Sequence, residues 1–266
     1  MRYFLILSII AIASCRKDNL KGNVEELKPA ILAKITEPLT ANSLGYYIAL
    51  PSRYNSDIDK INYPLIISLS GAGSYGDSTK SLESVLEYGP MSFLNRGEMP
   101  PSFKVSNDNI SFVYAAPQFI NPPNSTEIYN FLKELKSILR IDESRIYLMG
   151  SSVGGRTATD FAAEYPEEIT ALVSMSGVSD YNVTSKVAAI AGNNLPVWVF
   201  HNSEDFAWPK SSALYFVEEL HKLNPIPLPF LTIIPEVDHN AWLFACDPSF
   251  KENETSVYEW FLKFQK

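Results

Sequence analysis

The sequence contains few cysteines and histidines and no cluster of basic residues. Its 266 residues include two cysteines, Cys15 and Cys246, so a disulfide-rich fold is excluded. The 22 basic residues form no run and are outnumbered by 30 acidic ones, which argues against nucleic acid as a partner. The three histidines and two cysteines form no ligand-spaced cluster of the zinc type, so no metal site is predicted.

The N-terminus, MRYFLILSIIAIASC, holds an apolar stretch from Tyr3 to Ala13 that is too short to span a bilayer as a mature helix. Arg2 before this stretch and Ile-Ala-Ser-Cys after it resemble the bacterial lipobox, where the chain is cut before a cysteine that then receives lipid. A plain signal peptide with a chance cysteine is the alternative. We predict a signal peptide over residues 1–14 and a mature chain anchored through Cys15 to a membrane of the bacterial cell envelope, outside the cytoplasm.

Beyond the anchor, the sequence predicts one domain. Residues 15–29 are polar and aperiodic and are expected to form a tether. Residues 30–266 show no internal repeat or low-complexity block and have the length of a single catalytic domain. With Cys15 lipidated, Cys246 has no disulfide partner, so the domain depends on its apolar core for stability.

The apolar runs of this domain alternate with amphipathic segments. Strands are expected over residues 45–50, 65–69, 111–115, 145–149, 171–175, 197–200 and 230–234. Helical spacing is found over 126–139, where Ser125 or Thr126 is the expected cap, over 211–223 and near the C-terminus from Val257 to Phe264. Continuous apolar strands alternating with helices predict a doubly wound, mostly parallel α/β sheet with helices on both faces. In such folds the ligand site lies beyond the carboxyl ends of the strands.

A serine between glycines follows one of these strands. Gly150-Ser151-Ser152-Val153-Gly154 matches G-x-S-x-G after the run RIYLM and before the helical segment RTATDFAAEYP. This strand-turn-helix context is the one that the motif needs, because a sharp turn raises the central hydroxyl above the sheet. Small residues let strand and helix approach, which accounts for the two glycines. Ser152 is therefore the candidate nucleophile, and Ser151 is not.

A serine hydroxyl needs a base, and the sequence offers three histidines. His239 follows the strand FLTII on a loop and comes after the serine, in the order typical of α/β hydrolases. His221 is expected on the solvent side of a helix, and His201, at the end of VWVFH, is expected to be a structural partner. His239 is therefore the candidate base.

The acid is expected on the loop HNSEDFAWP, after the strand that ends near His201. A carboxylate placed just past that strand can reach the far ring nitrogen of the histidine and fix its tautomer. Asp205 is the first choice, while Glu204 and Asp180 are alternatives. Asp238 is too close in sequence to His239 to orient its ring.

An oxyanion site requires two backbone N–H donors. The amide of Val153 opens the helix after the serine, and Ser70-Gly71-Ala72-Gly73 follows the strand LIISL, where glycines let the backbone approach a substrate. An ordinary glycine turn is the alternative for this second loop.

Taken together, the segments YYIALPSRY, PLIISLSGAG, YGPMSFLNRGEMPPSF, FVYAAPQ, YLMGSSVGG, VWVFHNSEDFAWP and EVDHNAW resemble α/β-hydrolases of the esterase and phospholipase/carboxylesterase-like group, with polyhydroxyalkanoate depolymerase-like and feruloyl-esterase-like relatives. The resemblance covers nearly all of residues 40–265. It implies Ser152, Asp205 and His239 as the catalytic triad, and Ala72 as the second oxyanion amide beside Val153. Three positions depart from the pattern of this group: Ser70 replaces a histidine, and Asn202 and Asp238 replace glycines.

These residues predict a serine hydrolase that cleaves carboxylic esters through an acyl-enzyme and needs no cofactor. Tyr75, Phe119, Trp208 and Trp242 are expected on loops at the strand ends as an aromatic wall against the substrate, with simple loop packing as the alternative. A small or glycan-linked ester is the expected substrate. A serine peptidase of the same fold, or a lipoprotein that binds a glycan or a partner without catalysis, are the other functions considered.

Overall fold

The computed structural model describes residues 28–56, 61–76, 80–178 and 182–266. The predicted signal peptide, Cys15 and the alternative acid Asp180 lie outside the described residues, as does most of the predicted tether. Within the described ranges, none of the helices is long and apolar enough to cross a membrane.

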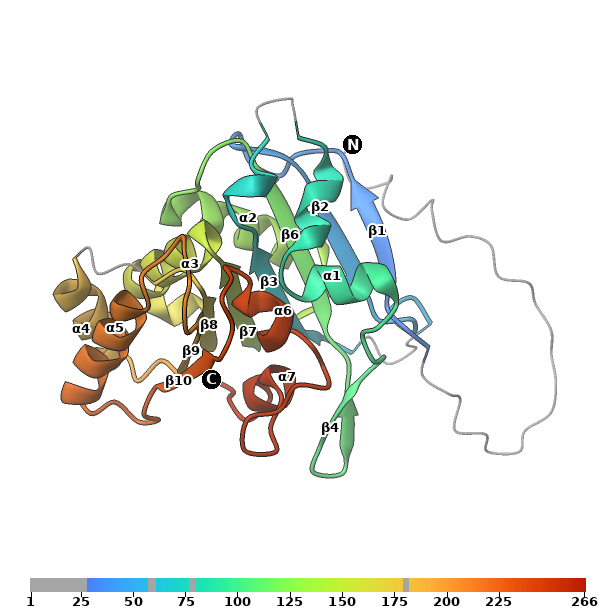
Figure 1. The fold of residues 1–266 in the computed structure, drawn as a ribbon. Coiled ribbons are helices and arrows are strands. Elements are labelled where there is room, and N and C mark those ends of the chain that lie inside the picture. The colour runs from blue at the N-terminus through green and yellow to red at the C-terminus, as the bar shows by residue number, and fades with distance from the viewer. Residues whose placement is uncertain (1–27, 57–60, 77–79, 179–181) are drawn as a thin grey trace.

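An eight-stranded sheet runs through the centre of the domain (Figure 1). The strand order is β1-β2-β6-β3-β7-β8-β9-β10, with β3, β6, β7, β8, β9 and β10 parallel and β2 antiparallel to its neighbours. The strands are β1 (Ile31–Ile35), β2 (Ser43–Leu50), β3 (Tyr63–Leu69), β6 (Val113–Phe119), β7 (Ile141–Ser151), β8 (Ala171–Met175), β9 (Val197–Asn202) and β10 (Phe230–Ile234). The predicted doubly wound, mostly parallel α/β sheet is confirmed.

Helices cover both faces of this sheet. One face carries α2 (Ser125–Ile138), α3 (Val153–Glu164), α4 (Val183–Gly192) and α5 (Lys210–Lys222), and the other carries η2 (Leu82–Glu87), α1 (Gly89–Arg96), α6 (Ala241–Ala245) and α7 (Val257–Phe261). In Figure 1, α1, α6 and α7 lie in front of the sheet. Short 3₁₀ turns η1 (Ala72–Ser74) and η3 (Pro166–Glu168) complete the helical elements of the described ranges.

The sheet separates two hydrophobic cores. Alternate residues of one strand enter opposite cores, as the two-residue period of a strand requires: Ile146 and Leu148 of β7 pack toward α2–α5, while Tyr147 and Met149 pack toward α1, α6 and α7. All four side chains are fully buried. Strands buried on both faces explain why their sequences read as continuous apolar runs.

Several elements differ from the sequence-based expectation. The edge strand β1 was not predicted because only part of ILAKI is buried, and the hairpin of β4 (Phe103–Val105) and β5 (Asp108–Ile110) was missed because its strands have three residues each. The predicted cap of α2 was wrong by one residue. Asn124 caps this helix, since its side chain accepts from the Glu127 amide while the Glu127 carboxylate accepts from the Asn124 amide.

The close approach of α3 to β7 and to the neighbouring β3 depends on two glycines. A Cβ atom added to Gly150 would lie 2.1 Å from the carbonyl oxygen of Gly154, and one added to Gly154 would lie 2.3 Å from the carbonyl oxygen of Leu69. Backbone atoms cannot move aside by changing rotamer as a side chain can. Any side chain at these two positions would therefore force the strands and the helix apart.

We therefore expect Gly154→Ala to lower the free energy of unfolding by about 3 kcal/mol or more, near the upper end of the usual cost of overpacking. Gly192→Ala is the matched control, because an added Cβ at that position of α4 meets nothing within 4 Å. Alanine should change stability there by less than about 1 kcal/mol, in the stabilising direction. Urea denaturation of the three proteins measures both effects, and equal midpoints for the two variants would contradict the packing argument.

Candidate active site

Ser152 occupies a strained turn between β7 and α3. Its backbone has φ 54° and ψ −123°, a conformation that residues other than glycine rarely adopt. Three backbone hydrogen bonds hold it: the Ser152 amide donates to the Met175 carbonyl at 2.8 Å, and the amides of Gly155 and Arg156 donate to the Ser152 carbonyl at 2.8 and 3.2 Å. The neighbouring Ser151 is fully buried. The structure therefore presents Ser152, and not Ser151, at the end of the strand.

The structure brings Ser152 together with the predicted base and acid. The Ser152 Oγ lies 2.7 Å from His239 Nε2, and His239 Nδ1 lies 2.9 and 2.8 Å from the two carboxylate oxygens of Asp205. A carboxylate can only accept a hydrogen bond, so Nδ1 carries the proton and Nε2 is left unprotonated toward the hydroxyl. This tautomer can take the proton of Ser152.

The side chain of Asp205 is fully buried yet has several donors around it. Burial raises the pKa of this carboxyl, but hydrogen bonds from His239 and from the amides of Trp208 and Ala207 outweigh burial and hold the pKa below its ordinary value. The carboxylate is thus kept ionised beside the imidazole. The alternative Glu204 does not reach His239: it is exposed and lies 3.9 Å from the Lys210 ammonium.

His201 lies behind the acid. Its Nδ1 is 2.9 Å from the Asn202 carbonyl oxygen, which can only accept, so Nδ1 carries the proton. Its Nε2 is buried without a hydrogen-bond partner, 3.9 Å from Asp205. Burial lowers the pKa of His201. This histidine packs against the carboxylate without replacing His239, and His221 is exposed on α5, as predicted.

Two of the departures from the esterase pattern lie in one hydrogen-bond network. The buried Asn202 amide donates to the Asn240 side-chain oxygen at 2.9 Å, and Asn202 Oδ1 accepts from Ser176 Oγ at 3.2 Å and from the Asn240 amide at 3.3 Å. Asn240 Nδ2 in turn donates to Asp238 at 2.8 Å, and the other oxygen of Asp238 accepts from the His239 amide at 2.7 Å. The network ties the loop of His239 to the end of β9.

The two predicted oxyanion residues lie on either side of Ser152. Val153 is the first residue of α3, so its amide has no partner within the helix. Ala72 begins η1, in which the amides of Ser74 and Tyr75 bond back to Gly71 and Ala72 while that of Ala72 does not. A Cβ added to Gly71 would lie 3.3 Å from the Ser152 Cβ, which places η1 directly against the serine. The Ser70 hydroxyl next to it is buried without a partner.

Of the four predicted aromatic residues, Trp242 and Trp208 lie beside the triad, Tyr75 follows η1 with its hydroxyl buried, and Phe119 lies elsewhere. The ring of Trp242 lies 5.4 Å from that of His239, and Trp208 sits beside the acid, where its indole donates to the Val178 carbonyl at 2.6 Å. The prediction for Phe119 was wrong. The strand β6 continues past its predicted end and pairs Phe119 with Ser43, so its ring is buried against Phe131.

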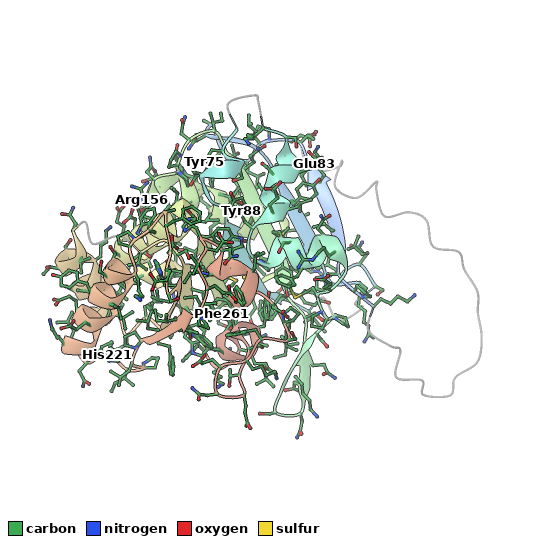
Figure 2. All side chains as sticks on the ribbon, viewed as in Figure 1. Tyr75, Glu83, Tyr88, Arg156, His221 and Phe261 are labelled. Atoms are coloured by element: carbon green, nitrogen blue, oxygen red, sulfur yellow. The ribbon has the colours of Figure 1, made fainter. Side chains whose placement is uncertain are left out.

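The sequence analysis missed two further aromatic residues, one beside His239 and one beside Trp242. Phe206, directly after the acid, is 77% exposed with its ring 6.1 Å from His239. Tyr88, between η2 and α1, has its ring 5.3 Å from Trp242 and its hydroxyl against Gly73 (Figure 2). The position of Phe206 next to Asp205 was the one available signal, whereas nothing in the sequence relates Tyr88 to η1.

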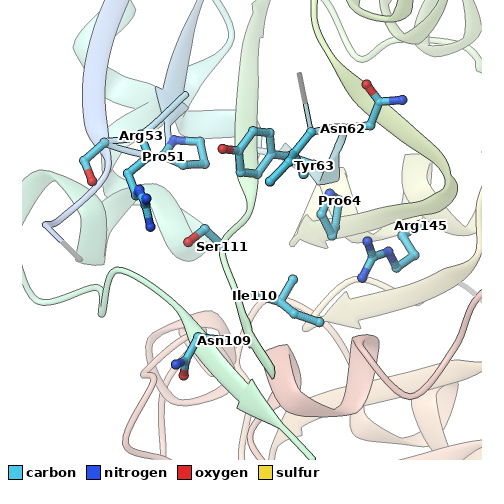
Figure 3. A pocket seen from close by; sticks show the side chains of 11 residues that line it. Pro51, Arg53, Asn62, Tyr63, Pro64, Asn109, Ile110, Ser111 and Arg145 are labelled. Carbon is cyan, nitrogen blue, oxygen red and sulfur yellow. The ribbon is translucent and has the colours of Figure 1, made fainter. Parts of the chain in front are cut away.

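A cavity of about 210 Å³ lies at the opposite end of the strands from the triad, where β3 and β6 begin (Figure 3). Its lining includes Asn62, Tyr63, Ser111 and Arg145, all far along their strands from Ser152. This cavity takes no part in the candidate active site.

Comparison with known proteins agrees with this architecture. The family model described as alpha/beta hydrolase fold matches residues 90–205, which include Ser152 and Asp205 and end before His239. No curated protein matches the sequence.

Solved structures share the fold at low sequence identity. A thermostable esterase is 21% identical, with a TM-score of 0.61 over 89% of this chain and 63% of its own, so the chain spans less than two thirds of that esterase. The feruloyl esterase module from Clostridium thermocellum, complexed with sinapinate, is 15% identical with a TM-score of 0.59 over 82% and 85% of the two chains. The fluorophosphonate-binding serine hydrolase F of Staphylococcus aureus is 12% identical with a TM-score of 0.56 over 80% and 93%. The chain therefore has the α/β-hydrolase fold.

Proposed function

We propose that this protein is a serine hydrolase that cleaves carboxylic esters through an acyl-enzyme on Ser152. The observation that carries the proposal is the continuous hydrogen-bonded line from Ser152 through His239 to a buried, ionised Asp205. A hydroxyl 2.7 Å from an unprotonated imidazole nitrogen is in the position from which a base removes its proton.

The reaction begins when Ser152 Oγ attacks the ester carbonyl and passes its proton to His239 Nε2. The Asp205 carboxylate stabilises the resulting imidazolium and holds its orientation. The negative charge that develops on the carbonyl oxygen is bound by the amides of Val153 and Ala72. His239 then gives its proton to the departing alcohol, and a water molecule, activated by the same imidazole, releases the acid and restores the serine.

Removal of the serine hydroxyl tests this proposal. We expect Ser152→Ala to lower the turnover of short-chain p-nitrophenyl esters by about four to six orders of magnitude, because the nucleophile and its base act as a unit. Ser151→Ala is the matched control, since the Ser151 hydroxyl is buried away from His239, and it should keep ester turnover and labelling by a fluorophosphonate. Equal rates for the wild type and Ser152→Ala would overturn the proposal, and Ser152-dependent turnover of peptide amides would favour a serine peptidase.

The ionised state of Asp205 predicts how stability depends on pH. Because its pKa is lowered in the folded protein, the unfolded chain binds more protons near pH 4, and the contribution of this carboxylate is lost as pH falls through the folded pKa. The difference in unfolding free energy between the wild type and Asp205→Asn should therefore be constant above about pH 5 and shrink below about pH 4. Chemical denaturation at several pH values measures it. A difference that grows on acidification would show that the carboxyl is not held ionised.

We also propose that the protein removes acyl groups from glycans while anchored at the cell envelope. The likeness to a feruloyl esterase module and the predicted lipobox support this placement. If the anchor exists, cells supplied with an alkyne-bearing fatty acid should label the wild type, while Cys15→Ser should remain unlabelled. Cys246→Ser is the control, since that thiol is buried, and it should label like the wild type; labelling of Cys15→Ser would exclude the anchor.

A further inference from the structure

Arg156 carries a charge that nothing in the described structure neutralises. It lies on the first turn of α3, four residues after Ser152, and its Nε is buried without a hydrogen-bond partner. Arg96 and Arg145, in contrast, form ion pairs with Glu98 and Asp142. A partly buried guanidinium without an anion is costly, so the site is expected to receive its anion from outside the chain.

The hydroxyl of Tyr75 is the second unsatisfied group at this place. It is buried without a hydrogen-bond partner. Both groups belong to segments that contact Ser152: a Cβ added to Gly71, four residues before Tyr75, would lie 3.3 Å from the Ser152 Cβ, and the Arg156 amide donates to the Ser152 carbonyl at 3.2 Å. Burial raises the pKa of Tyr75, and the positive charge of Arg156 opposes that rise. Tyr75 directly follows η1, the turn that holds Ala72. Figure 2 shows Arg156, Tyr75 and Tyr88 toward the same end of the molecule.

The position of Arg156 relative to Ser152 follows from helix geometry. The Arg156 amide donates to the Ser152 carbonyl at 3.2 Å, and side chains of a helix lean toward its N-terminus, which Ser152 precedes. The guanidinium is therefore directed over the turn that carries Ser152. The first amides of α3 add to the positive potential there.

The two sides of Ser152 differ in chemistry. Tyr75 packs against the core on the α2–α5 face, whereas Trp242 packs against the core on the α1, α6 and α7 face, beside His239. A departing alcohol must lie near His239, from which it takes a proton. The acyl group then extends to the other side, toward Arg156 and Tyr75.

We infer that Arg156 and Tyr75 bind a carboxylate on the acyl group, so that the preferred substrates are monoesters of short dicarboxylic acids. The inference rests on the proposed ester hydrolysis. A planar guanidinium binds a carboxylate through two parallel N–H donors, and the tyrosine hydroxyl supplies a third donor. A neutral acyl chain would leave Arg156 Nε and the Tyr75 hydroxyl without a partner, which favours a carboxylate on the acyl group.

The test compares monomethyl succinate with methyl butyrate, two esters of similar length that differ in the terminal carboxylate. The wild type should hydrolyse monomethyl succinate with at least a tenfold higher kcat/KM. Arg156→Gln should lower the ratio of the two kcat/KM values by about 10- to 100-fold, as expected for loss of a charge-assisted hydrogen bond. Arg156→Lys, which keeps the charge but not the planar fork, should lower it less, and Arg96→Gln, an arginine already paired with Glu98, is the matched control.

Tyr75→Phe separates binding from folding. Removal of a buried hydroxyl without a partner should leave stability unchanged or raise it, yet should lower the same ratio several-fold. A ratio that is identical in the wild type, Tyr75→Phe and Arg156→Gln would overturn the inference.

A binding measurement keeps this inference distinct from the proposed hydrolysis. In the Ser152→Ala protein, succinate should raise the melting temperature more than butyramide does, and Arg156→Gln introduced into that protein should abolish the difference. Succinate binding without ester turnover would support the anion site and refute the esterase. Turnover of both esters without succinate-dependent stabilisation would support the esterase and refute the anion site.

Discussion

The contact between β7 and α3 is the constraint on which the rest of the site depends. Carbonyl oxygens occupy the places where Cβ atoms of Gly150 and Gly154 would stand. At this separation the chain can pass from strand to helix only through a turn as sharp as that of Ser152, with its positive φ. The same turn lifts the hydroxyl out of the sheet and places it beside the first amides of the helix, which can bind the oxygen of a carbonyl group that it attacks.

The sheet brings Ser152 together with the other groups of the candidate active site. Consecutive parallel strands end at one edge, so the loops after β3, β7, β9 and β10 deliver an amide, a hydroxyl, a carboxylate and an imidazole to a single place. At this place the charge of the buried Asp205 is stabilised by hydrogen bonds. Its oxygens exchange bulk water for two backbone amides and an imidazole, which keeps the carboxylate ionised while the surrounding loop fixes its direction.

The strand runs and the triad could be predicted because each depends on local sequence. A buried parallel strand must be apolar throughout, and Ser152 and Asp205 each follow such a strand. His239 follows β10, an edge strand that is apolar although partly exposed. The wrong or missing predictions concern residues whose positions depend on contacts distant in the sequence. Phe119 was placed on a loop because the end of β6 is set by pairing with Ser43, and Tyr88 was missed because its neighbours Gly73 and Trp242 are distant in sequence. The missing partner of Arg156 is likewise visible only once the fold is assembled.

The network around Asn202 has a consequence for how such a site changes during evolution. In relatives with glycine at this position and before the histidine, neither side chain exists. Here the buried amide of Asn202 and the carboxylate of Asp238 both bond to Asn240, so loss of either one alone leaves a polar group of the loop without its partner. The two substitutions are therefore epistatic. Glycine at both positions would remove both of these partners of the Asn240 side chain, so a change to the glycine pattern is expected to involve Asn240 as well.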